Sequence, residues 1–87
     1  MNNSHQLHLL HFTVYGTSKA IGAIGKPEDF IFYCSNVEPF SARDAYVQAR
    51  TGLYAQGREH IQITKVTWTS NYGGEPIVIE PDEYLEG

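Results

Sequence analysis

The sequence has few of the residues that indicate a disulfide-stapled, secreted or membrane-spanning protein. Its 87 residues include one cysteine, Cys34, which has no second cysteine to pair with, and a lone thiol fits a reducing compartment. No apolar run approaches the length that crosses a bilayer, and the N-terminus shows no basic segment followed by an apolar core, as a signal peptide would. We therefore expect a soluble, cytoplasmic protein with a single domain over residues 1–87.

Basic residues are also scarce, and they are unevenly spread. Six Lys and Arg against ten Asp and Glu give a formal net charge of −4, which argues against broad, charge-driven binding to nucleic acid. All six basic residues lie between Lys19 and Lys65, whereas the chain after Val66 has five acids and no base. We predict an acidic tail at residues 81–87 and a frayed, polar N-terminus at residues 1–6.

The clearest structural pattern is one long helix between Ser41 and Gly57. Ser41 is a good N-cap, Asp44 lies where its charge favours the helix N-terminus, and Gly57 fits the residue just past the C-cap. One face of this helix is mostly small, comprising Ala42, Ala45, Tyr46, Ala49, Gly52 and Leu53. We expect that face to pack closely against a sheet.

Strand patterns flank this helix on both sides. They cover residues 7–15, 29–35, 59–69 and 75–80. The apolar parity changes between Ile63 and Val66, so a bulge near Thr64 and Lys65 would keep Ile61, Ile63, Val66 and Trp68 on the inner face. The order predicts an α+β fold: a two-layer ββαββ domain with a mainly antiparallel four-stranded sheet and one helix on one face.

The second and fourth strands have features that bear on their place in the sheet. Residues 29–35 are apolar on both faces, which favours a central strand or one with a partner surface opposite the helix. Pro76 places the fourth strand, or its start, at an edge.

A glycine-rich segment at residues 16–28 is predicted to be a loop or an irregular hairpin. It contains Gly25-Lys26, but a phosphate-binding loop needs a glycine where Ala20 stands and a hydroxyl where Pro27 stands. We expect its two isoleucines, Ile21 and Ile24, to fold onto the core.

No convincing catalytic or metal-binding set is found in the sequence. His5, His8 and His11 are spaced three apart, but they coincide with a strand pattern that turns His8 to the opposite face. Cys34 and His60 have the chemistry of a nucleophile and a base, although a mid-strand cysteine among aromatics is usually a small buried residue. The nearby acids Glu80 and Asp82 fit a solvated pair. We therefore predict no enzyme activity, no metal and no cofactor.

The aromatic residues indicate surfaces rather than catalysis. Tyr15, Tyr33 and Trp68 are candidates for the sheet face away from the helix. Three occupants of that face stay open: a cover formed by the 16–28 loop or a second copy of the chain, another protein, or stacked single-stranded bases. On the helix, Arg43, Val47, Arg50 and Tyr54 form either a solvated flank or a small contact surface.

The segment from Phe30 to Val66 resembles a known class of small proteins. It combines a strand pair, the capped helix start Ser41-Ala-Arg-Asp-Ala and the strand Ile61-Gln-Ile-Thr-Lys-Val. In this it resembles accessory proteins of phages and mobile elements, of which the anti-CRISPR proteins are the best known. The resemblance implies a binder that blocks a host machine, commonly at a nucleic-acid-binding surface. It carries no diagnostic motif and assigns no site residue.

The sequence thus predicts a non-enzymatic protein-interaction module, an inhibitor of a host nucleic-acid-handling complex in its narrower form. Its predicted protein-binding residues are acids and tyrosines, namely Glu75, Glu80, Asp82, Glu83, Glu86, Tyr84, Tyr15 and Tyr33. The alternative is a single-stranded nucleic-acid-binding module that uses the sheet aromatics Tyr15 and Tyr33 together with Lys19, Lys26, Arg43, Arg50 and Tyr54. A small ligand-binding domain is a third class.

Overall fold

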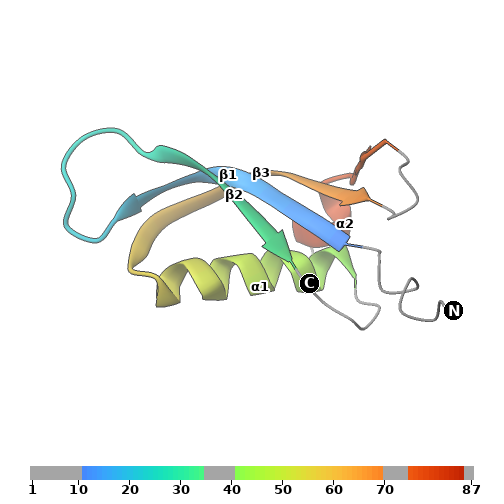
Figure 1. The fold of residues 1–87 in the computed structure, drawn as a ribbon, viewed down its shortest axis with the longest axis horizontal. Helices are drawn as coiled ribbons and strands as arrows, with labels where there is room; N and C mark the ends of the chain where they lie inside the picture. Colours follow the sequence, from blue (N-terminus) through green and yellow to red (C-terminus); the bar gives the residue numbers. More distant parts are fainter. Residues whose placement is uncertain (1–10, 35–40, 70–74, 86–87) are drawn as a thin grey trace, which may run out of the picture.

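Four strands and two helices follow one another as β1, β2, α1, β3, β4 and α2 (Figure 1). The computed structural model describes residues 11–34, 41–69 and 75–85. The strands form one antiparallel sheet in the order β2-β1-β3-β4, and α1 packs against one of its faces (Figure 1). The elements are β1 His11–Ala20, β2 Glu28–Cys34, α1 Ala42–Ala55, β3 Arg58–Thr69, β4 Ile77–Val78 and α2 Asp82–Leu85. The predicted two-layer α+β fold is confirmed, with α2 as a short addition.

The first helix begins and ends as its sequence predicts. The Ser41 hydroxyl accepts a bond from Asp44 N at 3.1 Å, and the Asp44 carboxylate accepts one from Ser41 N at 3.4 Å, which completes a capping box. Gly57 follows the C-cap with φ of 83°, a conformation that costs glycine least. Local signals at both ends therefore define α1.

The core lies between α1 and the two central strands. Ala45 and Ala49 are fully buried together with Val14 of β1 and Val66 of β3. A Cβ on Gly52 would lie 2.8 Å from the Phe32 ring, so the missing side chain is what lets helix and sheet approach here. The predicted small face of the helix is the packed face.

The bulge predicted near Thr64 and Lys65 is present. The β1–β3 pairing passes from Tyr15 with Lys65 to Gly16 with Ile63, and this leaves Thr64 as the extra residue. Ile61 and Val66 are buried, and Ile63 and Trp68 pack against the core. A second register shift follows between Thr17 and Lys19, beside His60, whose φ is 54°.

The first strand is displaced from its predicted position. β1 continues through Gly16 to Ala20. Of the two predictions for residues 16–28, a loop holds only for residues 21–27, whereas a hairpin agrees with the antiparallel pairing of β1 and β2. A Cβ on Gly16 would overlap the backbone carbonyl of Gln62. Gly16 therefore permits a close strand approach and is not a turn residue. Residues 7–10 of the predicted strand lie outside the described part.

Both outer strands also differ from expectation. β2 lies at an edge of the sheet, so its prediction as a central strand is wrong, whereas the alternative of a partner surface opposite the helix stays a prediction. The fourth strand was predicted over residues 75–80 and is only two residues long in β4. Within the described residues, neither helix has the length and apolar content that a membrane span needs.

Candidate functional site

The predicted acidic residues gather on β4, α2 and the segments beside them. Glu75, Glu80, Asp82 and Glu83 are all exposed, and neither of the two ion pairs found among the described residues involves them. Glu86, the fifth predicted acid, lies outside the described residues. We call these four exposed carboxylates the acidic end.

The acidic end is anchored to the body of the protein through Arg43 and Tyr84. Arg43 Nη1 donates to the carbonyl oxygens of Tyr84 at 2.8 Å and Leu85 at 3.4 Å, which satisfies acceptors that α2 itself cannot pair. The Tyr84 ring lies 5.6 Å from that of Tyr46 on α1. The segment predicted to be an acidic tail is therefore a helical turn that is docked on α1 (Figure 1).

Tyr84 does not occupy the surface position that was predicted for it. The residue is 3% exposed and belongs to the hydrophobic core. Burial raises the pKa of its hydroxyl, and the neighbouring Tyr46 raises it further. A partner at the acidic end would contact the carboxylates, while Tyr84 holds the segment that carries them.

The helix arginines are engaged within the protein. The Arg50 guanidinium lies 5.8 Å from the ring centroids of both Tyr46 and Tyr54, and Arg43 lies 5.3 Å from that of Tyr46. These are cation–π distances. Arg43, Arg50 and Tyr54 thus form an intramolecular stack along one flank of α1.

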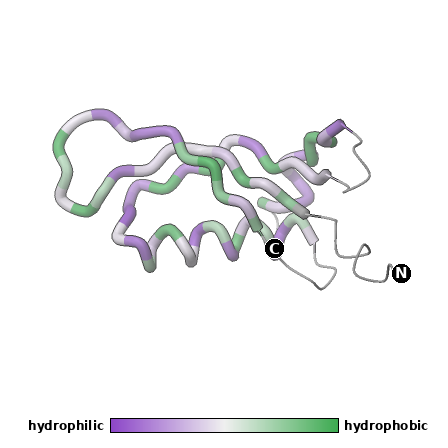
Figure 2. Tube along the Cα trace, in the orientation of Figure 1, coloured by the Kyte–Doolittle hydropathy of each residue, from purple (hydrophilic) through white to green (hydrophobic). Residues whose placement is uncertain are grey.

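The two lysines of the predicted nucleic-acid set lie elsewhere. Lys19 and Lys26 belong to the β1–β2 hairpin, whose loop projects beyond the C-terminal end of α1 (Figure 1), whereas Arg43 is in the first turn of that helix. Ile21 and Ile24 on the loop were expected to fold onto the core, but Ile24 is 99% exposed and Ile21 is exposed too. Figure 2 shows green, apolar segments on the projecting loop. The basic residues therefore form no continuous site.

Tyr15 and Tyr33 lie on the sheet face opposite α1, as predicted. They alternate with Val14 and Phe32, which pack toward the helix. Tyr33 is 72% exposed, whereas Tyr15 is half-buried and has Lys65 Nζ 4.4 Å from its ring centroid. Trp68 is on the helix side and is not part of this face. We call Tyr15, Ile31, Tyr33, Lys65 and Val78 the open face.

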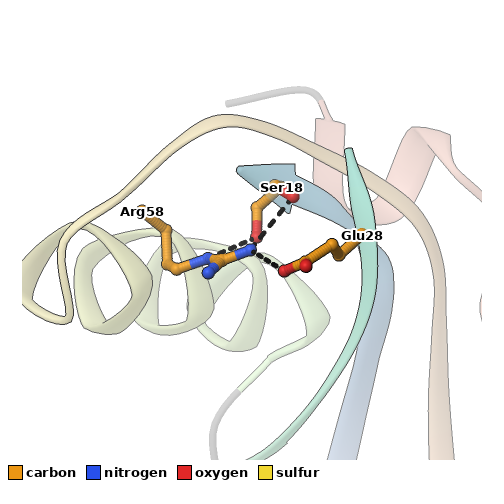
Figure 3. Close-up of polar contacts among 3 residues, drawn as sticks. All are labelled: Ser18, Glu28 and Arg58. Atoms are coloured by element: carbon orange, nitrogen blue, oxygen red, sulfur yellow. Dashed lines mark hydrogen bonds and ion pairs between the residues drawn. The ribbon is translucent and has the colours of Figure 1, made fainter. Parts of the chain in front are cut away.

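An arginine that the sequence did not single out ties three strands together at the base of the hairpin. Arg58 at the start of β3 donates from Nε to Ser18 Oγ at 3.0 Å and from Nη2 to the Ser18 carbonyl at 3.1 Å and to Glu28 Oε1 at 3.0 Å (Figure 3). Ser18 is fully buried, so its hydroxyl needs this partner. The Arg58 cluster fixes the beginning of β2 against β1 and β3.

Cys34 and His60 are too far apart to act together. Cys34 pairs with Phe12 at one end of the β1–β2 ladder, while His60 follows Glu59, the partner of Lys19 toward the other end of β1. Burial raises the pKa of the Cys34 thiol to about 11, and its Sγ donates to the Ala45 carbonyl at 3.9 Å. A reactive cysteine needs the opposite pKa shift.

The predicted absence of a metal site can be examined over part of the chain. In residues 11–34, 41–69 and 75–85, no three His, Cys, Asp or Glu side chains are placed to hold a metal ion. His5 and His8 lie outside these ranges.

Two features escaped the sequence interpretation for different reasons. The Arg58–Ser18 contact joins residues 40 positions apart, and neither residue has a local pattern that reveals it. The short helix α2 did have a signal, because Pro81 followed by Asp82 and Glu83 is typical of a helix start.

Protein-family models, curated protein sequences and solved structures give no significant match to this chain. Its function is therefore argued from its own residues.

Proposed function

We propose that this protein is a non-enzymatic interaction module whose acidic end binds a basic surface of a partner protein. One observation carries the proposal: Glu75, Glu80, Asp82 and Glu83 are exposed and lack ion-pair partners among the described residues. They lie along β4, which pairs with β3, and α2, which Arg43 and Tyr84 anchor to α1. Anchored charges lose less conformational freedom on binding than charges on a free tail.

A groove that normally holds phosphates is the surface that such carboxylates fit best. It presents Lys and Arg side chains to a negative ligand, and complementary charge speeds the encounter of two proteins. The narrower form of the proposal, an inhibitor from a phage or mobile element that occupies such a groove in a CRISPR-like defence complex, rests on the resemblance described above.

Direct binding of single-stranded nucleic acid has less support. It needs cations and aromatic rings along one path, whereas Arg43 and Arg50 are stacked on tyrosines and the two lysines lie on the hairpin. Few unengaged Lys and Arg side chains therefore lie together on one surface where they could bind phosphates.

The experiment compares two double variants that carry the same change in charge. Glu80→Gln with Asp82→Asn alters the acidic end, while Asp29→Asn with Glu59→Gln alters acids elsewhere, and each pair brings the net charge from −4 to −2. Association with a purified CRISPR effector complex, or with partners captured from a host lysate, is measured at low and high salt. We expect the first pair to lower the on-rate about tenfold at low salt and the second to change it little.

A labelled oligonucleotide serves as the opposing probe. Equal effects of the two double variants would contradict the position of the site. Tight oligonucleotide binding by the wild type at physiological salt, weakened by Arg50→Glu, would replace the proposal with the nucleic-acid alternative.

A further inference from the structure

The outer side of β2 is an open sheet edge. Seven consecutive residues of β2 pair with β1 without a register shift, and among residues 11–34, 41–69 and 75–85 the sheet order places no strand on its other side. In an antiparallel pair, every second residue directs its backbone N–H and C=O away from the partner strand. β2 contains no proline, lysine or bulge, and its charged residues, Glu28 and Asp29, lie only at its start, after Pro27.

β2 has apolar side chains that are at least partly exposed on both of its faces, and an added strand could cover them. On the open face, Ile31 and Tyr33 are 52% and 72% exposed. On the helix side, Phe30 and Phe32 are only partly buried, and they border a hollow of about 430 Å³ that Leu53 and Gln56 of α1 also line. An added strand would therefore cover apolar side chains above the sheet and fill the hollow below it.

We propose that the occupant of this edge is β2 of a second copy of the chain, paired antiparallel about a two-fold axis at Ile31. Ile31 is the middle residue of the seven in β2, so an axis there pairs the two strands over their full length. Ile31 then faces its own counterpart, Phe30 faces Phe32 of the other copy, and Asp29 faces Tyr33 of the other copy. Cross-strand apolar and aromatic neighbours of this kind stabilise sheets.

The charges of β2 favour the antiparallel arrangement. Glu28 and Asp29 begin the strand and no basic residue follows in it, so parallel pairing would bring like charges together. Antiparallel pairing sets the two copies of Glu28 six residues apart, roughly 20 Å at about 3.4 Å per residue, which is beyond the screening length of about 8 Å at physiological salt. It also brings the exposed Tyr33 hydroxyl to Asp29, which has no partner among the described hydrogen bonds and ion pairs.

This inference does not depend on the proposed function. The acidic end lies by β4, at the opposite edge of the sheet from β2. Joining two β2 strands would make one continuous sheet with an acidic end at each outer side.

Sedimentation equilibrium of the full chain tests the inference from about 1 to 300 μM, the range suited to a small interface. The wild type should change from monomer to dimer. Ile31→Lys places two like charges opposite each other at the axis and should weaken the dimer at least tenfold. Val78→Lys is the matched control, because Val78 is 60% exposed on the same face at the other edge, and it should leave the dimer unchanged. A wild type that stays monomeric, or equal weakening by both variants, would overturn the inference.

Cysteine cross-linking tests the register. Directly opposed residues have Cα atoms about 4.5–5.5 Å apart, within disulfide range. Ile31→Cys should therefore form a covalent dimer under mild oxidation by diamide, whereas Asp29→Cys, which would face Tyr33, should not. The native Cys34 is buried and should not compete. This pairing is refuted if Ile31→Cys forms no cross-link, or if Asp29→Cys forms one equally well. It is also refuted if the edge binds only an extended peptide of another protein.

Discussion

β2 and β4 both lie at an edge of the same sheet, but β2 pairs through seven residues and β4 through two. Pro76 precedes β4 and Pro81 follows it, and four acids surround it. Short length, proline and charge each discourage a further strand from pairing. β2 has a long regular backbone and exposed apolar residues instead. The two edges therefore offer different modes of contact: charge at β4 and strand pairing at β2.

Truncating one tyrosine at each edge should produce the largest contrast. Tyr84→Ala removes a buried ring that anchors α2 and should cost about 3 kcal/mol of unfolding free energy. Tyr33→Ala removes an exposed ring and should change the stability of the monomer by no more than about 0.5 kcal/mol. Urea denaturation at low protein concentration measures both. Similar losses would show that the two edges are equally packed.

A change beneath the central strands should disturb both edges at once. Ala49 is fully buried between α1 and the sheet, so Ala49→Leu should overpack the core and destabilise the protein by about 1–3 kcal/mol. Val47→Leu on the exposed side of the same helix is the control and should have little effect. Thermal denaturation of the two variants makes the comparison. Unchanged stability in Ala49→Leu would mean that helix and sheet are less closely packed than described.

A pH-dependent effect is expected at the buried end of β2, where Cys34 lies. The pKa of Cys34 is raised from 9.0 to about 11 in the folded protein, so between these pH values the unfolded chain loses the thiol proton while the folded chain keeps it. Stability should therefore fall as the pH rises from about 9 to about 11. Cys34→Ala should show a shallower fall in urea denaturation over the same range. Identical pH slopes in the wild type and in Cys34→Ala would mean that the Cys34 thiol is exposed to water.

Features specified by neighbouring residues could be predicted from the sequence. The capping box of Ser41 and Asp44 joins residues three positions apart, and Gly57 needs only its own backbone conformation. The Thr64 bulge was predictable because the side-chain parity of a strand changes when one residue is inserted. These signals need no knowledge of the rest of the chain.

Features that depend on distant partners were missed or misplaced. Gly16 has the composition of a loop residue, but its role is set by the approach of Gln62 across the sheet. The candidate site shows the same division: the four acids of the acidic end were found by counting charges, whereas the burial of Tyr84 depends on Arg43 and Tyr46. These contacts hold α2 against α1, and no pattern among neighbouring residues in the sequence indicates them.

The sequence by itself determined the α+β class, the limits and packed face of α1, the inner face of β3 and the uneven distribution of charge, because each follows from residue type and short-range periodicity. The tertiary structure decided which strand lies at each edge, because a sheet order is a choice among pairings of residues far apart in the chain. Within the described part of the chain, it placed β1 between β2 and β3, left the apolar β2 with a free side and docked α2 on α1. The positions of both proposed contact surfaces follow from that order.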